Sequence, residues 1–104
     1  MRYTYLLLPA ALGLGLASFE ATAQTWPTKP LKVIVPFAAG SAMDIVPRLV
    51  FEQLAAQLGQ STVIENRPGA GGTIGAGFVA KANPDGYTIL AHSSAHTIAP
   101  ALYT

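Results

Sequence analysis

Three short runs of β-branched and apolar residues divide this chain, and the segments between them have a helical period. The runs span residues 31–35, 62–65 and 87–91. The first, Leu-Lys-Val-Ile-Val, is apolar on both faces, which is typical of a buried parallel strand. Helices are predicted over residues 44–58 and 74–82, and the last residues begin another. The order β-α-β-α-β predicts an α/β fold, an incomplete parallel three-layer sheet with right-handed crossovers.

Residues that start and stop secondary structure agree with these bounds. Asp44 is a natural N-cap for the first helix, and Pro47 would then fall in its first turn, where the missing N–H is not needed. Gly59 predicts the end of that helix. The string Asn-Pro-Asp-Gly at 83–86 predicts a turn before the third strand.

Each predicted strand ends in a junction of small or polar residues. These are Pro-Phe-Ala-Ala-Gly-Ser (36–41), Glu-Asn-Arg-Pro-Gly-Ala-Gly-Gly (65–72) and His-Ser-Ser (92–94). Ligands bind outside the carboxyl ends of strands in open parallel sheets, and a helix N-terminus after such a turn offers outward N–H groups to an anion. Hydroxyls of Ser41, Thr73, Ser93 and Ser94 would add donors, which together suit a carboxylate. The alternative is that the glycines only allow tight turns and the serines only cap helices.

The first residues have the layout of a secretory signal peptide. Arg2 is followed by an apolar run over residues 6–17, and Ala-Thr-Ala at 21–23 has the small-x-small form of a cleavage site. The apolar run is shorter than the ~18 residues expected of a membrane span, which disfavours a retained anchor. We therefore predict a signal peptide over residues 1–23, a mature segment over residues 24–104 with no membrane span, and export from the cytoplasm.

Composition and motif spacing argue against several classes of function. The net charge is +1 and the charges are unclustered, which disfavours nucleic-acid binding, and the chain has no cysteine. Gly-Ala-Gly-Phe-Val-Ala at 75–80 matches a dinucleotide fingerprint formally, but it lies inside a predicted helix and not at a strand–helix turn. His92 and His96 could pair on a helix, but no third metal ligand is close in the sequence. We predict no cofactor, no metal site and no catalytic residues.

Several separated blocks of the mature segment resemble one family. They are Pro-Leu-Lys-Val-Ile-Val-Pro-Phe (30–37), the Glu-Asn-Arg-Pro-Gly-Ala-Gly-Gly string (65–72), Pro-Asp-Gly-Tyr-Thr (84–88) and Pro-Ala-Leu-Tyr (100–103). The chain resembles the N-terminal part of the Bug, or TctC-like, periplasmic solute-binding proteins of tripartite tricarboxylate transporters. The resemblance implies the first part of lobe 1 of a two-lobed "Venus flytrap" fold, a small carboxylated ligand, and a membrane permease as partner.

The same resemblance implies which residues contact the ligand. They lie in the loop after the first strand and near the ends of the second and third strands: Phe37, Ala38, Ala39, Gly40, Ser41, Asp44, Gly71, Gly72, Thr73, Ser93 and Ser94.

The chain also departs from the family pattern at several positions. Ser41 and Met43 replace a Gly and a small hydroxyl residue, and Ala95 and Ala99 replace residues that are often Thr and Asn. Pro47 stands where Ala is common. Family members are also much longer, so we expect the second lobe to be absent from this sequence. The alternative to a solute-binding protein is a truncated remnant without autonomous ligand binding.

Overall fold

The computed structural model describes residues 22–102. Three strands, β1 (Leu31–Val35), β2 (Thr62–Asn66) and β3 (Thr88–Leu90), form one sheet in the order β2-β1-β3. Both pairings are parallel, with Val33 opposite Ile64 on one side and Ile89 on the other. The predicted parallel α/β fold is confirmed. The signal peptide predicted over residues 1–23 lies almost wholly outside the described residues.

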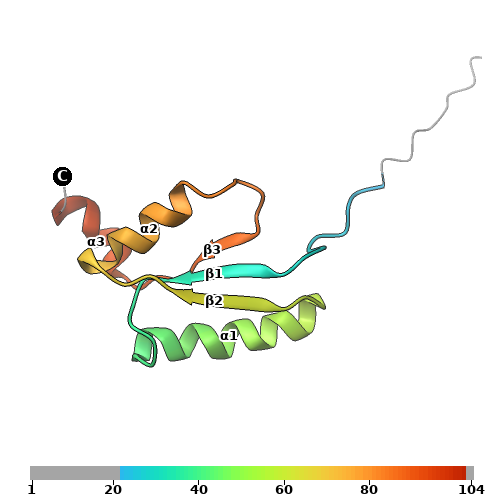
Figure 1. The fold of residues 1–104 in the computed structure, drawn as a ribbon, viewed down its shortest axis with the longest axis horizontal. Helices are drawn as coiled ribbons and strands as arrows, with labels where there is room; N and C mark the ends of the chain where they lie inside the picture. Colours follow the sequence, from blue (N-terminus) through green and yellow to red (C-terminus); the bar gives the residue numbers. More distant parts are fainter. Residues whose placement is uncertain (1–21, 103–104) are drawn as a thin grey trace, which may run out of the picture.

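The central strand β1 forms the core. Leu31, Val33, Ile34 and Val35 are each 0% exposed. Because successive side chains of a strand point to opposite faces, burial of Val33, Ile34 and Val35 requires cover on both faces. Figure 1 shows this cover, with α1 (Ala42–Leu58) and α2 (Thr73–Ala80) on opposite sides of the strands.

Helix α1 begins earlier than predicted. Its N-cap is Ser41, with extended φ and ψ of −70° and 162°, so the prediction that Asp44 caps the helix is wrong. Asp44 instead lies inside the first turn, and its carboxylate reaches back to the N–H of Gly40. Pro47 consequently lies in the second turn and not the first, where it leaves one carbonyl of the preceding turn without a helical donor. The predicted stop is confirmed, since Gly59 has φ 67° and donates its N–H to Ala55.

The remaining elements differ from prediction by one or two residues at their ends. Strand β2 extends to Asn66, and β3 is confined to Thr88–Leu90. A short 3-10 turn, η1 (Ala70–Gly72), precedes α2, which begins at Thr73 and ends at Ala80. The last helix, α3, spans Ala95–Leu102. Within residues 22–102, none of these helices combines the length and apolarity that crossing a bilayer requires.

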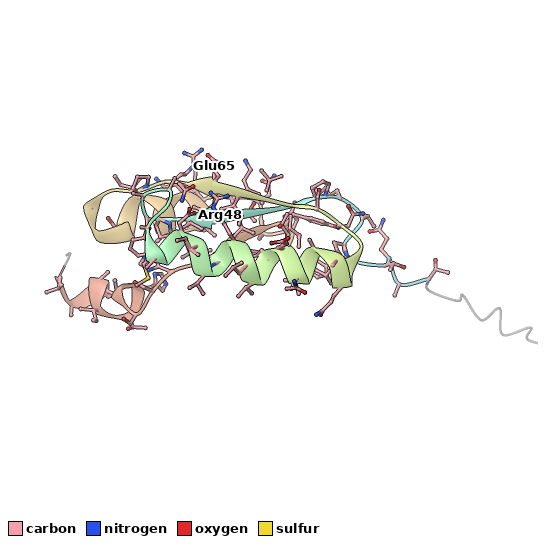
Figure 2. All side chains as sticks on the ribbon, turned by 90° about the horizontal axis from the view of Figure 1, so that it is seen from below. Arg48 and Glu65 are labelled. Atoms are coloured by element: carbon pink, nitrogen blue, oxygen red, sulfur yellow. The ribbon has the colours of Figure 1, made fainter. Side chains whose placement is uncertain are left out.

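Polar side chains attach α1 to the end of β2. Arg48 donates from Nη2 to the Asn66 Oδ1 at 3.0 Å. Figure 2 shows α1 lying along the strands, with Arg48 on the helix and Glu65 on β2. The carboxyl end of β2 is therefore held against the first turns of α1, which positions the loops described next.

Candidate ligand-binding site

Three loops meet at the carboxyl edge of the sheet. They are residues 36–41 after β1, residues 67–72 after β2 and residues 91–94 after β3. Because all three strands are parallel, these loops emerge on the same side. The structure therefore places the predicted site residues of all three junctions along one edge.

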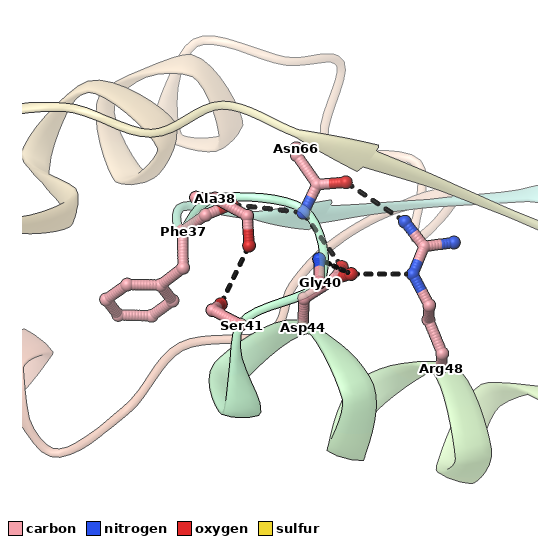
Figure 3. Close-up of polar contacts among 7 residues, drawn as sticks. All are labelled: Phe37, Ala38, Gly40, Ser41, Asp44, Arg48 and Asn66. Carbon is pink, nitrogen blue, oxygen red and sulfur yellow. Dashed lines mark hydrogen bonds and ion pairs between the residues drawn. The ribbon is translucent and has the colours of Figure 1, made fainter.

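A polar cluster of Asp44, Arg48 and Asn66 holds the first of these loops (Figure 3). Asp44 is 2% exposed, and its Oδ2 accepts from Gly40 N–H and from Arg48 Nε, each at 2.9 Å. Asn66 Nδ2 donates to Asp44 Oδ1 at 2.8 Å and to the Phe37 carbonyl at 3.0 Å. The Arg48 hydrogen bond, then those from Gly40 and Asn66, hold the pKa of Asp44 well below its ordinary value. Asp44 is thus ionised, neutralised by Arg48 and turned toward the protein.

Arg48 and Asn66 hold this edge together by hydrogen bonds, and the sequence does not single out either one as a site residue. Asn66 lies in the Gly-rich string, where its polarity could have been noticed. Its partners are the Phe37 carbonyl and the Asp44 carboxylate, on a loop and a helix 22 to 29 residues away in the chain. No sequence pattern of single residues indicates such a contact.

Many of the donors expected at these junctions are used within the turns. Gly72 N–H donates to Gly69 O at 3.0 Å, and Thr73 N–H donates to Ala70 O. The hydroxyl of Thr73 also donates to Ala70 O, at 2.8 Å, and that of Ser41 donates to Ala38 O at 2.7 Å. The expectation that the backbone donors of Gly72 and Thr73 face outward unpaired is therefore wrong, because the 3-10 turn closes on them.

Other donors on the same edge are available. Among residues 22–102, the N–H groups of Ala38, Ala39 and Ser94 have no hydrogen-bond acceptor. The hydroxyl oxygen of Ser93 accepts from Ala95 N–H at 3.3 Å, which leaves its hydrogen free to donate. The Ser94 hydroxyl likewise has no partner within the described residues. These neutral donors suit an anion.

A hollow of ≈ 220 Å³ lies between α2 and α3 beside this edge. Of the predicted site residues it is lined by Thr73 alone. Its other lining residues are Ala76, His92, His96, Ala99 and Pro100. In the sequence, the spacing of these two histidines suggests a pair of metal ligands without a third. In the described part of the chain, no three His, Asp or Glu side chains come close enough to hold a metal ion.

Comparison with known proteins identifies the family. Residues 46–104, more than half of the chain, match the family model described as "Tripartite tricarboxylate transporter family receptor", or TctC. The chain belongs to the TctC family. It is 48% identical over 100 residues to a UPF0065 protein of Bordetella bronchiseptica, a match that covers 95% of this chain and 29% of that protein. It is also 39% identical over 104 residues to the protein BugT of Bordetella pertussis, which covers 98% of this chain and 32% of BugT.

Several solved structures share the fold. The periplasmic binding protein BugD is 51% identical, with a TM-score of 0.60 over 62% of this chain and 22% of BugD. The Rhodopseudomonas palustris protein MatC, solved with malate, has a TM-score of 0.59 at 48% identity. A further R. palustris protein, solved with adipate, has a TM-score of 0.60 at 45% identity. Each of these two matches likewise covers 62% of this chain and 22% of the other.

These matches confirm the resemblance found in the sequence. The described residues are a part of a periplasmic-binding-protein fold, and TctC proteins are solute receptors rather than enzymes. The chain spans about a third or less of the length of the relatives named above.

Proposed function

We propose that this chain forms the first part of the ligand-binding lobe of a periplasmic protein that captures a small carboxylate for a tripartite tricarboxylate-type transporter. The predicted signal peptide supports the periplasmic location. Membership of a family of transporter receptors supports the transporter's membrane permease as partner. Relatives solved with adipate and malate support a carboxylate as ligand.

The observation that carries the proposal is the set of unpaired neutral donors on one edge of the sheet. Three backbone N–H groups and two hydroxyls, from the loops after β1 and β3, lack acceptors among residues 22–102. The nearby carboxylate of Asp44 does not oppose an anion, because Arg48 neutralises it and its oxygens are turned inward. We therefore assign Asp44, together with Gly40 and Ser41, to positioning the loop after β1 rather than to contact with the ligand.

The proposed binding step is capture of a carboxylate by these donors. Hydrogen bonds to a charged group contribute about 1.5–3 kcal/mol each, more than those between neutral groups. A complete site would add contacts from the opposite lobe and exclude water, which raises affinity. Because the donors of these loops contact the ligand from one side, we expect them by themselves to bind a carboxylate weakly, at about millimolar Kd.

An amide-resolved NMR titration of the purified protein tests this proposal. Adding adipate or malate should shift the amide signals of Ala38, Ala39 and Ser94, while the uncharged diamide of adipate should not. Ser94→Ala should weaken binding roughly tenfold, since it removes one hydrogen bond to a charged group. The matched control is Ser61→Ala, which removes an exposed hydroxyl at the opposite end of the sheet. The absence of shifts at these amides, with every carboxylate tried, would refute the proposal.

A further inference from the structure

His92 contacts all three loops at the carboxyl edge. It lies two residues after the end of β3, in the third loop, and its ring meets the Phe37 ring of the first loop edge to face, with centroids 5.3 Å apart. Figure 3 shows the Phe37 ring turned away from the Asp44 cluster. Its contact with the second loop is at Gly72, where a Cβ would lie 2.4 Å from His92 Nε2. Since real Cβ atoms do not approach so closely, only glycine at 72 leaves room for the ring.

The hydrogen bonds of His92 determine which ring nitrogen carries the proton. Ser93 N–H donates to Nδ1 at 2.8 Å, whereas the Ser93 carbonyl oxygen lies farther away, at 3.2 Å, so Nδ1 is the acceptor. In the neutral ring the hydrogen therefore resides on Nε2. Nε2 has no hydrogen-bond partner among residues 22–102. His92 thus presents a donor that the protein itself leaves unused.

The surroundings of this donor indicate the chemistry of its ligand. His92 lines the ≈ 220 Å³ hollow, whose other walls include the apolar side chains of Ala76, Ala99 and Pro100. The Thr73 hydroxyl in the wall already donates to Ala70 O. A ligand here would find the N–H donor of His92 and the imidazole ring of His96 beside an apolar surface. That combination favours a carboxylate on a short hydrocarbon chain over a ligand with several hydroxyls, which would be buried without partners.

We infer that His92 is a specificity-determining residue of the binding site. Its Nε2–H donates to a carboxylate oxygen of an aliphatic acid, and the methylene chain of the acid lies against Ala76, Ala99 and Pro100. The inference rests on the proposed carboxylate-binding function and adds both a residue and a ligand class to it. The packing of Phe37 and Gly72 on the ring gives His92 a fixed orientation, which is what selective recognition requires.

Adipate is the probe for the test, with malate for comparison. In the full chain, His92→Phe keeps an aromatic ring against Phe37 but removes the donor. We expect it to weaken adipate binding about 10- to 100-fold, as for loss of a hydrogen bond to a charged group, with little change in Tm. His92→Gln, whose amide can donate from a similar position, should restore much of the affinity. Adipate should bind the wild-type protein more tightly than malate.

The outcomes separate this inference from the proposed function. If the wild-type protein binds adipate and His92→Phe binds it equally well, the role of His92 is refuted while carboxylate binding stands. If the wild-type protein binds no carboxylate, both fall. Should His92→Phe fail to fold, a ring-nitrogen NMR spectrum of the wild-type protein decides the matter. It should show the Nε2–H tautomer and a change at Nε2 on adding adipate, and an unchanged Nε2 signal would overturn the inference.

Discussion

At the scale of single residues, the buried charge of Asp44 holds a loop in position. Its carboxylate joins the loop after β1, through Gly40, to Arg48 of α1 and Asn66 of β2. A buried charge is costly unless it is paired and fully hydrogen-bonded, and both conditions are met here. Asp44 and Asn66 together therefore hold the loop that carries the donors of Ala38 and Ala39.

Asp44→Asn should destabilise the protein. The substitution removes the charge that pairs with Arg48 and replaces one acceptor oxygen by a donor facing other donors. We expect Tm in a thermal melt to fall by several degrees at neutral pH. Glu52→Gln, an exposed change on the same helix, is the control and should have almost no effect.

The effect of Asp44→Asn on Tm should depend on pH. Because the pKa of Asp44 in the folded protein lies well below its unfolded value of about 3.9, its stabilisation is fully present above that value. It is lost as the pH falls from about 4 toward the folded pKa. The Tm difference between wild type and Asp44→Asn should therefore be constant from about pH 7 to 5 and shrink below about pH 4. A difference that persists unchanged in acid would contradict this account.

At the scale of elements, the close approach of α2 to β1 depends on one glycine. A Cβ at Gly75 would lie 2.6 Å from Pro36 Cβ and 3.0 Å from the Arg67 carbonyl oxygen. Arg67 also contacts α2 through its side chain, because its guanidinium stacks on the Phe78 ring at 3.7 Å from the ring centroid. Backbone and proline cannot move aside as a flexible side chain can.

Gly75→Ala and Gly77→Ala form a matched pair on this helix. The first should destabilise the protein by about 1–3 kcal/mol, because α2 must shift to relieve the overlap. At Gly77 a Cβ meets nothing within 4 Å, so alanine should stabilise the helix by about 0.5–1 kcal/mol. Urea unfolding measures both values. Equal effects at the two positions would show that helix propensity, and not the contact with β1, dominates.

At the scale of the whole molecule, α1 carries an apolar face that the described residues do not cover. Met43, Val46, Leu49 and Val50 are between 48% and 60% exposed. Figure 1 shows α1 at the outside of the fold, with the strands on its other side. A surface helix normally exposes polar residues, whereas this face of α1 exposes apolar ones, as a helix covered by other residues would have.

This face should bind a hydrophobic fluorescent dye. Val46→Lys combined with Val50→Lys should reduce dye fluorescence by roughly half, since it removes about half of the apolar side chains of the face, and should leave Tm nearly unchanged. The control is Gln53→Lys with Gln57→Lys, which adds the same charge on the same helix without removing apolar area. Equal loss of fluorescence in both double variants would attribute the effect to charge.

The alternation of short apolar runs with helical segments is sufficient to predict the parallel α/β fold, because hydrophobic periodicity is a local property. Gly59 is correctly predicted as a helix stop for the same reason. The N-cap is wrongly predicted, since a capping Asp and a first-turn Asp that reaches back to the loop look alike until the position of the loop is known. Ser41, five residues after the buried Pro36, takes the cap with an extended backbone.

Some features of the candidate site are likewise predictable from the sequence, and others are not. The sequence by itself determined which loops gather at the carboxyl edge, because parallel strands leave no other arrangement, and it indicated the family through the Gly-rich string. Only the tertiary structure decided which donors remain free, because Gly72 and Thr73 use theirs within the turn while Ala38, Ala39 and Ser94 do not. It also brought the His92 ring against Gly72 and Phe37. Such contacts join residues 20 to 55 positions apart, and their geometry depends on how the helices pack across the sheet, which no local pattern encodes.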